Sequence, residues 1–248
     1  MRPSSREAAR PAPLLPAANR GIRPAKNFAR PVRRGISAFL LKSESSFTLP
    51  KAISPMSYEI LPVLVRGTHC NVSDHVFKQI WDQLVAENRL AMLFFSGEVK
   101  SFTEWRQLLT SPSHIAAIAV DVQRGRFCHV AWLNGVAGHR ANAHHAALGQ
   151  FRPGAARAIL RYWQGLRNGD GTPAIHLLLG VTPEANPLAR RALRVLGFQE
   201  SGVVPMMCMD VTTGKAEPGV TSYCLLQELQ LDRTRPPDTP TRAEAALA

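Results

Sequence analysis

Hydrophobic and polar residues in the central part of the chain follow patterns that predict short strands alternating with helices. A run of apolar residues at 60–65 predicts a strand. Apolar side chains then recur every three or four residues over 74–88, which predicts a helix capped by Ser73 or Asp74. The apolar run at 90–95 is short, as strands are, and predicts a second strand.

A capping box opens the next predicted helix. Ser101 and Glu104 are three residues apart, so each side chain can satisfy a free backbone amide at the helix start, and Pro112 ends the helix. Apolar runs at 114–122 and 126–133, separated by a short turn, then predict a hairpin. A connection rich in His and Ala follows.

The second half of the chain has the clearest pattern. Apolar residues predict helices and strands over 154–167, 174–181, 187–196, 203–211 and 222–229. Asn186 is suited to cap the helix that begins at Pro187, and Gly197 is suited to end it. This order predicts an α/β fold of the mixed α+β kind, in which helices flank a mixed sheet, in one domain over 56–230.

Residues 1–55 have a different composition. They include eight prolines, eleven Lys or Arg and two acidic residues, and so carry nine of the twelve net positive charges. Such a segment buries too little apolar surface to offset its ordering entropy, so we expect disorder here and in the tail at 231–248. The segment could be a basic arm that contacts nucleic acid, a targeting peptide, or residues upstream of a start at Met56, which the pattern favours.

Composition argues against several classes of protein. No apolar run reaches the roughly 18 to 20 residues of a membrane helix. The four cysteines form no Cys-x-x-Cys pair, which indicates reduced thiols and a cytoplasmic protein. His139, His144 and His145 lie in the irregular connection without the spacing of metal ligands, so we expect no metal.

Small residues mark the start of the helix predicted at 154–167. Gly154-Ala155-Ala156 would let the backbone approach an anion, and a helix start presents free amides and the positive end of the helix dipole. Arg152 and Arg157 would add charge-assisted hydrogen bonds to phosphate oxygens. The alternative is an ordinary helix start, with a turn at Pro153.

This segment resembles the GNAT superfamily of N-acetyltransferases. Gly154 to Leu160 is similar to the end of the family's pyrophosphate loop, and Asn186, Ala189 and Gly197-Phe198 have the family's spacing. The resemblance covers the second half by motif and the first half by element order, and it is closest to GNAT-like proteins of bacteriophages and prophages. It implies a splayed central sheet, acetyl-CoA as co-substrate, and direct attack by an amine acceptor, which could be a small molecule or a protein.

The resemblance also implies which residues bind the cofactor: Gln150, Arg152, Pro153, Gly154, Ala155, Ala156, Arg157 and Asn186. Two positions depart from the family. Phe151 stands where the family has Gln or Arg, and Leu193 stands where it commonly has the Tyr that protonates the leaving thiolate. Either water protonates the thiolate, or the protein is a catalytically degenerate phage or prophage accessory protein that binds a partner.

His129 is the residue we expect to act as the catalytic base. A histidine titrates near neutrality and could take the proton of an ammonium group, although a hydrogen-bonded core histidine is the alternative interpretation. Asp121 and Glu104 are weaker candidates, and a backbone amide around 131–133 would stabilise the oxyanion. The first two helices and the loop after the hairpin would line the acceptor groove, and a homodimer is possible.

Overall fold

The structure is a computed structural model that describes residues 23–24, 58–95 and 97–231. The segments predicted to be disordered, 1–55 and 231–248, therefore lie outside the described residues, except for Leu231 and Arg23–Pro24 (β1). Strand β1 pairs in antiparallel orientation with Leu166–Arg167 (β8).

One large sheet organises the described part of the chain. Its seven strands lie in the order β10-β11-β9-β7-β6-β5-β2. Their bounds are β2 (Tyr58–Pro62), β5 (Ile115–Asp121), β6 (Arg126–Ala137), β7 (Arg140–Ala147), β9 (Leu177–Pro183), β10 (Gln199–Asp210) and β11 (Lys215–Leu225). Neighbours are antiparallel except β7 and β9, which are parallel, so the predicted mixed sheet is confirmed.

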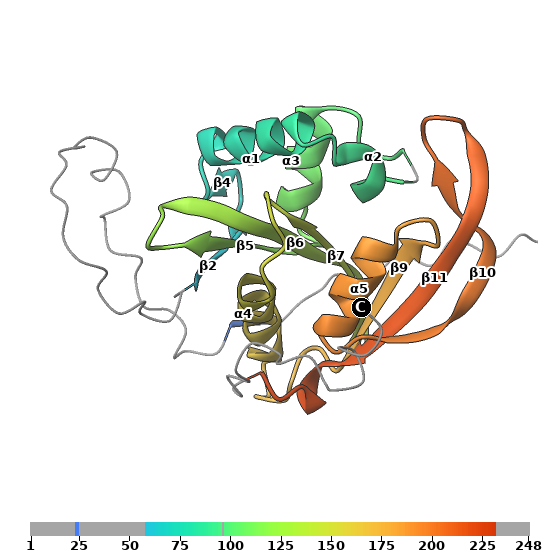
Figure 1. The fold of residues 1–248 in the computed structure, drawn as a ribbon. Coiled ribbons are helices and arrows are strands. Elements are labelled where there is room, and N and C mark those ends of the chain that lie inside the picture. Colours follow the sequence, from blue (N-terminus) through green and yellow to red (C-terminus); the bar gives the residue numbers. More distant parts are fainter. Residues whose placement is uncertain (1–22, 25–57, 96, 232–248) are drawn as a thin grey trace, which may run out of the picture.

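Helices cover both faces of this sheet, as Figure 1 shows. One face carries α1 (Asp74–Ala86), α2 (Leu90–Leu93) and α3 (Phe102–Thr110), and the other carries α4 (Pro153–Gln164) and α5 (Pro187–Val195). Each face has its own apolar core, built from alternate residues of the strands. The remaining short elements are β3 (Val65–Arg66), β4 (His69–Cys70) and the 3-10 helix η3 (Leu226–Glu228).

Two of the predicted helix caps are confirmed, whereas Ser73 stands at the start of α1 without a side-chain cap hydrogen bond. Ser101 Oγ accepts a hydrogen bond from the Glu104 amide at 3.3 Å, and a Glu104 carboxylate oxygen accepts one from the Ser101 amide at 3.0 Å. Asn186 Oδ1 accepts from the Ala189 amide at 3.1 Å and caps α5. Gly197 follows α5 with a φ of +91°, which a residue with a Cβ rarely adopts.

Two predicted elements are wrong. Residues 90–95 contain the helical turn α2 instead of a strand, because Leu, Ala and Met all favour helix and a short apolar run has no distinctive period. The connection predicted after the hairpin contains the strand β7, and β6 continues to Ala137. Pairing with β6 along the length of β7 builds this strand, although its sequence lacks the β-branched and aromatic residues that favour strands.

Candidate functional site

The two parallel strands of the sheet separate partway along their length. Strands β7 and β9 pair only over three residues, from Arg140 opposite Leu177 to Asn142 opposite Leu179. Both then continue, β7 to Ala147 and β9 to Pro183, without further pairing between them. The centre of the sheet therefore has a V-shaped opening with its apex at Asn142.

The edge of β7 that faces this opening carries backbone groups that have no hydrogen-bond partner among the described residues. The Leu148 amide donates to the Cys128 carbonyl at 2.8 Å, so even-numbered residues of this segment direct their backbone groups towards β6. Backbone groups alternate between the two neighbours along a strand. His145 and Ala147 must therefore direct their N–H and C=O groups into the opening.

A cleft of about 520 Å³ lies at the mouth of the opening. Its walls come from α2, the end of β7, the loop that leads into α4, and α5 along its length. Gln150, Pro153 and Asn186, three residues predicted to bind the cofactor, line it. Two cations, Arg89 and Arg191, line it as well. Its apolar walls are Met92, Leu93, Leu188 and Val195.

Arg152 points away from this cleft. Its Nη1 atom donates to Asp121 Oδ2 at 2.8 Å and to Cys128 Sγ at 3.6 Å. Burial alone would raise the pKa of Asp121, but hydrogen bonds and charge from Arg124 and Arg152 hold it below its ordinary value. The guanidinium of Arg152 thus connects the start of α4 with the hairpin of β5 and β6. The contact between Arg152 and a phosphate group stays a prediction.

The small residues at the start of α4 serve packing. A Cβ at Gly154 would lie 2.8 Å from Cε2 of Tyr58, so the ring of Tyr58 occupies the space that glycine leaves. Ala155 is fully buried, and Ala156 lines a second, smaller cavity. The Arg157 Nη2 atom donates to the Val195 carbonyl at 3.2 Å, at the end of α5. The binding of a phosphate by these residues at the start of α4 likewise stays a prediction.

The loop before α4 is fixed at Gly149 by two side chains that the sequence did not single out. Both carboxylate oxygens of Glu87 accept from the Gly149 amide at 2.9 Å, and Arg89 Nη2 donates to the Gly149 carbonyl at 2.6 Å. Burial alone would raise the pKa of Glu87, but the hydrogen bonds from Gln83 and Gly149 lower it. Glu87 therefore stays ionised and paired with Arg89 at the edge of the cleft.

His129 has the surroundings of a structural histidine. It is fully buried on β6, which does not border the opening, and its Nε2 atom accepts from the Arg152 amide at 3.4 Å. Burial, with smaller contributions from His145 and Arg89, lowers the pKa of His129 to about 3. These observations favour the core-histidine interpretation over a role as base. The weaker candidate Glu104 is engaged in the capping box of α3.

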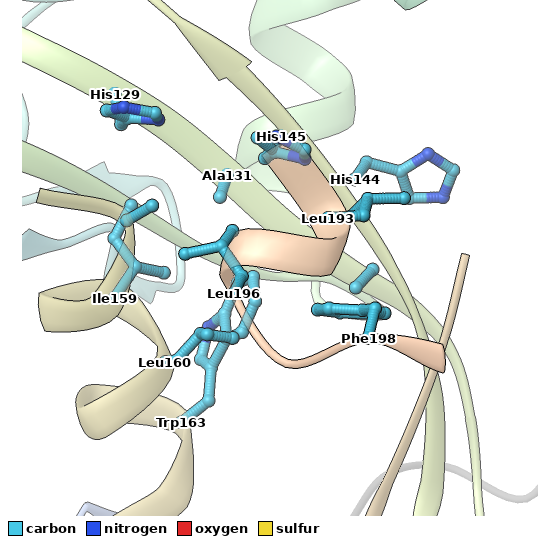
Figure 2. A pocket seen from close by; sticks show the side chains of 12 residues that line it. His129, Ala131, His144, His145, Ile159, Leu160, Trp163, Leu193, Leu196 and Phe198 are labelled. Carbon is cyan, nitrogen blue, oxygen red and sulfur yellow. The ribbon is translucent and has the colours of Figure 1, made fainter. Parts of the chain in front are cut away.

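The smaller cavity, of about 30 Å³, lies between the sheet and helices α4 and α5 (Figure 2). Leu193 is on its wall, so the departure from the family's tyrosine places an apolar side chain there. All three tyrosines are described, and none lines this cavity or the cleft. Tyr162 is in the core, and Tyr223 donates to Gln199 Oε1 at 2.7 Å.

His144 and His145 are residues that sequence analysis placed in a loop and that the structure places on β7. Consecutive residues of a strand point to opposite faces, and the two rings lie apart in Figure 2. His145 lines both the cleft and the smaller cavity. The signal that could have located them is the position of the segment, directly before the loop that leads into α4.

The separated parallel strands, with a loop and helix start beside them, can be compared with known folds. No protein-family model and no curated protein sequence matches the chain. Solved structures of acetyltransferases do match in fold. The chain has the GNAT fold.

Three of these structures illustrate the likeness. The spermidine N-acetyltransferase of Vibrio cholerae in complex with CoA and spermine has a TM-score of 0.50 at 16% identity, over 68% of this chain and 95% of that one. The ribosomal-protein-S5-alanine acetyltransferase of Vibrio fischeri has a TM-score of 0.50 at 12% identity, and the match covers 75% of this chain and 98% of that one. RimJ of Mycobacterium smegmatis in complex with CoA-disulfide has a TM-score of 0.51 at 14% identity, and the match covers 70% of this chain and 90% of that one.

The described part of the chain contains neither a membrane-spanning helix nor a metal site. No helix in the described part of the chain has the length and apolar character needed to cross a membrane. Among residues 23–24, 58–95 and 97–231, no group of three or more His, Cys, Asp or Glu side chains is arranged to hold a metal ion.

Proposed function

We propose that this protein is an acetyl-CoA-dependent N-acetyltransferase that transfers the acetyl group to an amine by direct attack. The observation that carries the proposal is the separation of β7 and β9 after Asn142, which leaves the backbone groups of His145 and Ala147 open beside a cleft of about 520 Å³. The GNAT fold supports the same activity, because two of the solved structures that share it are complexes with CoA or CoA-disulfide.

The residues around the cleft fit an acyl-CoA. An extended chain with amide groups could pair with the open edge of β7, as peptides add to exposed strand edges. Met92, Leu93 and Val195 offer apolar contacts to such a chain. Arg191 is exposed and has no hydrogen bond or ion pair with a described residue, so it is available for phosphate oxygens.

The eight cofactor residues expected from the sequence divide into two groups in this proposal. Gln150, Pro153 and Asn186 line the cleft and would contact the cofactor directly. The other five would hold the loop and helix start in place from behind: Arg152, Gly154, Ala155, Ala156 and Arg157.

An acyl thioester supplies an activated carbonyl whose oxygen gains negative charge when an amine attacks. The free amides of His145 and Ala147 are positioned to donate hydrogen bonds to that oxygen, in place of the amides we expected on β6. A thiol has a pKa near 8.5, so its thiolate can leave without an acid. Leu193 at the tyrosine position is therefore compatible with turnover.

The finer expectations stay predictions: a cytoplasmic location, an origin in a phage or prophage, a homodimer, and nucleic acid binding through residues 1–55. The acceptor is expected to be an amine of a small molecule or a protein. Described cysteines are all free thiols, which supports a reducing compartment.

Calorimetric titration with acetyl-CoA tests the proposal. We expect the wild-type protein to bind, Arg191→Glu to weaken binding about 10-fold or more, and the matched charge reversal Arg140→Glu, at the other end of β7, to leave binding unchanged. No binding by the wild type would overturn the proposal. Release of free thiol in the presence of amines would separate an enzyme from a protein that only binds acetyl-CoA.

A further inference from the structure

The turn between α1 and α2 holds the loop that leads from β7 into α4. Both carboxylate oxygens of Glu87 accept a hydrogen bond from the Gly149 amide at 2.9 Å, and Arg89 Nη2 donates to the Gly149 carbonyl at 2.6 Å. Arg89 Nε lies 2.5 Å from Glu87 Oε2, so the two side chains also form an ion pair. We call these contacts of Glu87 and Arg89 with Gly149 the clasp. It uses both backbone polar groups of a single residue that is 60 positions from Arg89 in the chain.

The clasp is attached firmly to the end of α1. The backbone amides of residues 87, 88 and 89 donate to carbonyls in the last turn of this helix, at 2.9 to 3.0 Å. Gln83, in the same turn, donates from Nε2 to Glu87 Oε1 at 2.7 Å. Leu84 is fully buried in the core between α1 and the sheet. The position of the clasp therefore follows from the packing of α1.

Gly149 is required for its backbone conformation. Its φ is +73°, in the left-handed region that a residue with a Cβ rarely adopts. A Cβ at this position would have no neighbour within 4 Å, so space alone would admit a larger residue. The clasp therefore holds the loop in a turn that glycine permits.

The loop is anchored on both sides of two residues that line the cleft, Gln150 and Phe151. The amides at 148 and 152 donate to atoms of β6, at 2.8 and 3.4 Å, and the amide at 149 donates to the clasp. The amides of Gln150 and Phe151 have no hydrogen-bond partner among the described residues. Two consecutive backbone donors are thus left free beside the cleft.

The side chains of the loop and helix start offer little to a phosphate in this arrangement. Arg152 donates to Asp121, and Arg157 donates to the Val195 carbonyl. Phe151 carries no hydrogen-bonding group in its side chain. Binding of a diphosphate by the loop would therefore depend on its backbone donors, and consecutive backbone amides are known to bind anions.

We infer that Glu87 and Arg89 are positioning residues for the cofactor, and that they act by holding Gly149 so that the next two amides can bind the diphosphate of acetyl-CoA. This inference rests on the proposed function and adds two residues from outside the loop to it. Without the clasp the loop would adopt several conformations. The apparent affinity would then fall in proportion to the fraction of molecules that keep the binding conformation.

Two ligands test this role: acetyl-CoA, and S-acetylpantetheine, which lacks the diphosphate and the nucleotide. Glu87→Gln keeps the size of the side chain but removes its charge and one acceptor. It should weaken the binding of acetyl-CoA about 10-fold and leave the binding of S-acetylpantetheine unchanged. Chemical-shift titration of the protein amides measures both affinities, including millimolar ones. Equal losses for the two ligands, or no loss for acetyl-CoA, would overturn the inference.

Glu200→Gln is the matched control. Glu200 is 28% exposed, close to the 23% of Glu87, and it also pairs with arginine side chains, those of Arg190 and Arg194. It does not line the cleft and accepts no hydrogen bond from the loop. Its substitution should leave the affinity for both ligands unchanged.

Arg89→Lys separates the clasp from a direct effect of charge, because Arg89 itself lines the cleft. Lysine keeps the positive charge but has no planar fork to reach Glu87 and the Gly149 carbonyl together. The variant should therefore weaken the binding of acetyl-CoA about as much as Glu87→Gln does. Wild-type affinity in Arg89→Lys would show that charge near the ligand suffices, and would overturn the inference.

The wild-type protein gives an independent readout in the same spectra. The amide resonances of Gln150 and Phe151 should shift when acetyl-CoA binds and stay in place when S-acetylpantetheine binds. Unshifted resonances in a protein saturated with acetyl-CoA would overturn the inference and leave the proposed function intact. A wild-type protein that fails to bind acetyl-CoA would instead contradict the proposed function.

Discussion

The Nη1 atom of Arg152 lies 2.8 Å from Oδ2 of Asp121, whose side chain has no exposure to solvent. The two residues are 31 positions apart, and they connect the start of α4 with the end of β5. A guanidinium that sequence analysis assigned to phosphate binding thus has a partner inside the protein. The ion pair fixes the position of the helix start that forms one wall of the cleft.

Asp121→Asn should destabilise the protein by about 3 kcal/mol, because it removes the charge that compensates Arg152 in a largely buried site. Urea unfolding at pH 7 measures this. Asp82→Asn is the matched control, since Asp82 pairs with Lys78 at the surface with 56% of its side chain exposed. In Asp82→Asn the free energy of unfolding should change by less than about 1 kcal/mol. Equal effects of the two substitutions would show that the buried pair has no special role.

Two histidines, the buried His129 and the half-buried His145, predict how stability depends on pH. Burial lowers the pKa of His129 to about 3 and that of His145 to about 4, both below the value near 6.5 in the unfolded chain. As the pH falls below 6.5 the unfolded chain takes up protons before the folded protein does. The stability that the two neutral histidines contribute is therefore fully present above pH 6.5, and it is lost as the pH falls from 6.5 to about 4 for His145 and to about 3 for His129.

His129→Gln should make the free energy of unfolding less sensitive to pH. Between pH 7 and pH 5 the variant should lose about 1 to 2 kcal/mol less than the wild type, as urea midpoints at the two pH values would show. Carboxyl groups whose pKa is lowered in the folded protein, such as Asp121, stabilise it at every pH above their pKa in the unfolded chain. Their contribution is lost only at lower pH, below the range of this comparison. The same loss in both proteins would mean that His129 is protonated in the folded state.

Gly154→Ala should lower stability by about 1 to 3 kcal/mol, because the added methyl group meets the Tyr58 ring at 2.8 Å. Gly169→Ala is a suitable control, since its Cβ would have no neighbour within 4 Å. Thermal unfolding of the two variants without ligand measures the difference. If Gly154→Ala were as stable as the control and lost only affinity for acetyl-CoA, the glycine would serve the ligand and not the packing.

Local signals predicted much of the fold. Residues close in the sequence form the capping box of α3, the Asn186 cap of α5 and the turn at Gly197, and each depends on short-range hydrogen bonds or on a single backbone conformation. Strand β7 was missed because Ala, Asn and His carry little strand preference, and only its pairing with β6 makes it a strand.

The candidate site was predicted only in outline for a related reason. The sequence located the loop before α4 and the cap of α5, which both reach the cleft. It could not show that Arg152 is paired with Asp121 or that Gly154 packs on Tyr58, because these partners are far apart in the chain. Once β7 was read as a connection, the base was sought on β6, where the histidine is buried and already hydrogen-bonded.

Amide hydrogen exchange along β7, resolved by residue, tests most directly whether the separated strands hold the acyl-CoA. The amides of His144, Ala146 and Leu148 face β6, so they should be protected with or without ligand. Those of His145 and Ala147 face the opening, so they should exchange quickly in the free protein and at least one should slow markedly with saturating acetyl-CoA. Unchanged exchange at both residues in the presence of bound acetyl-CoA would contradict the account.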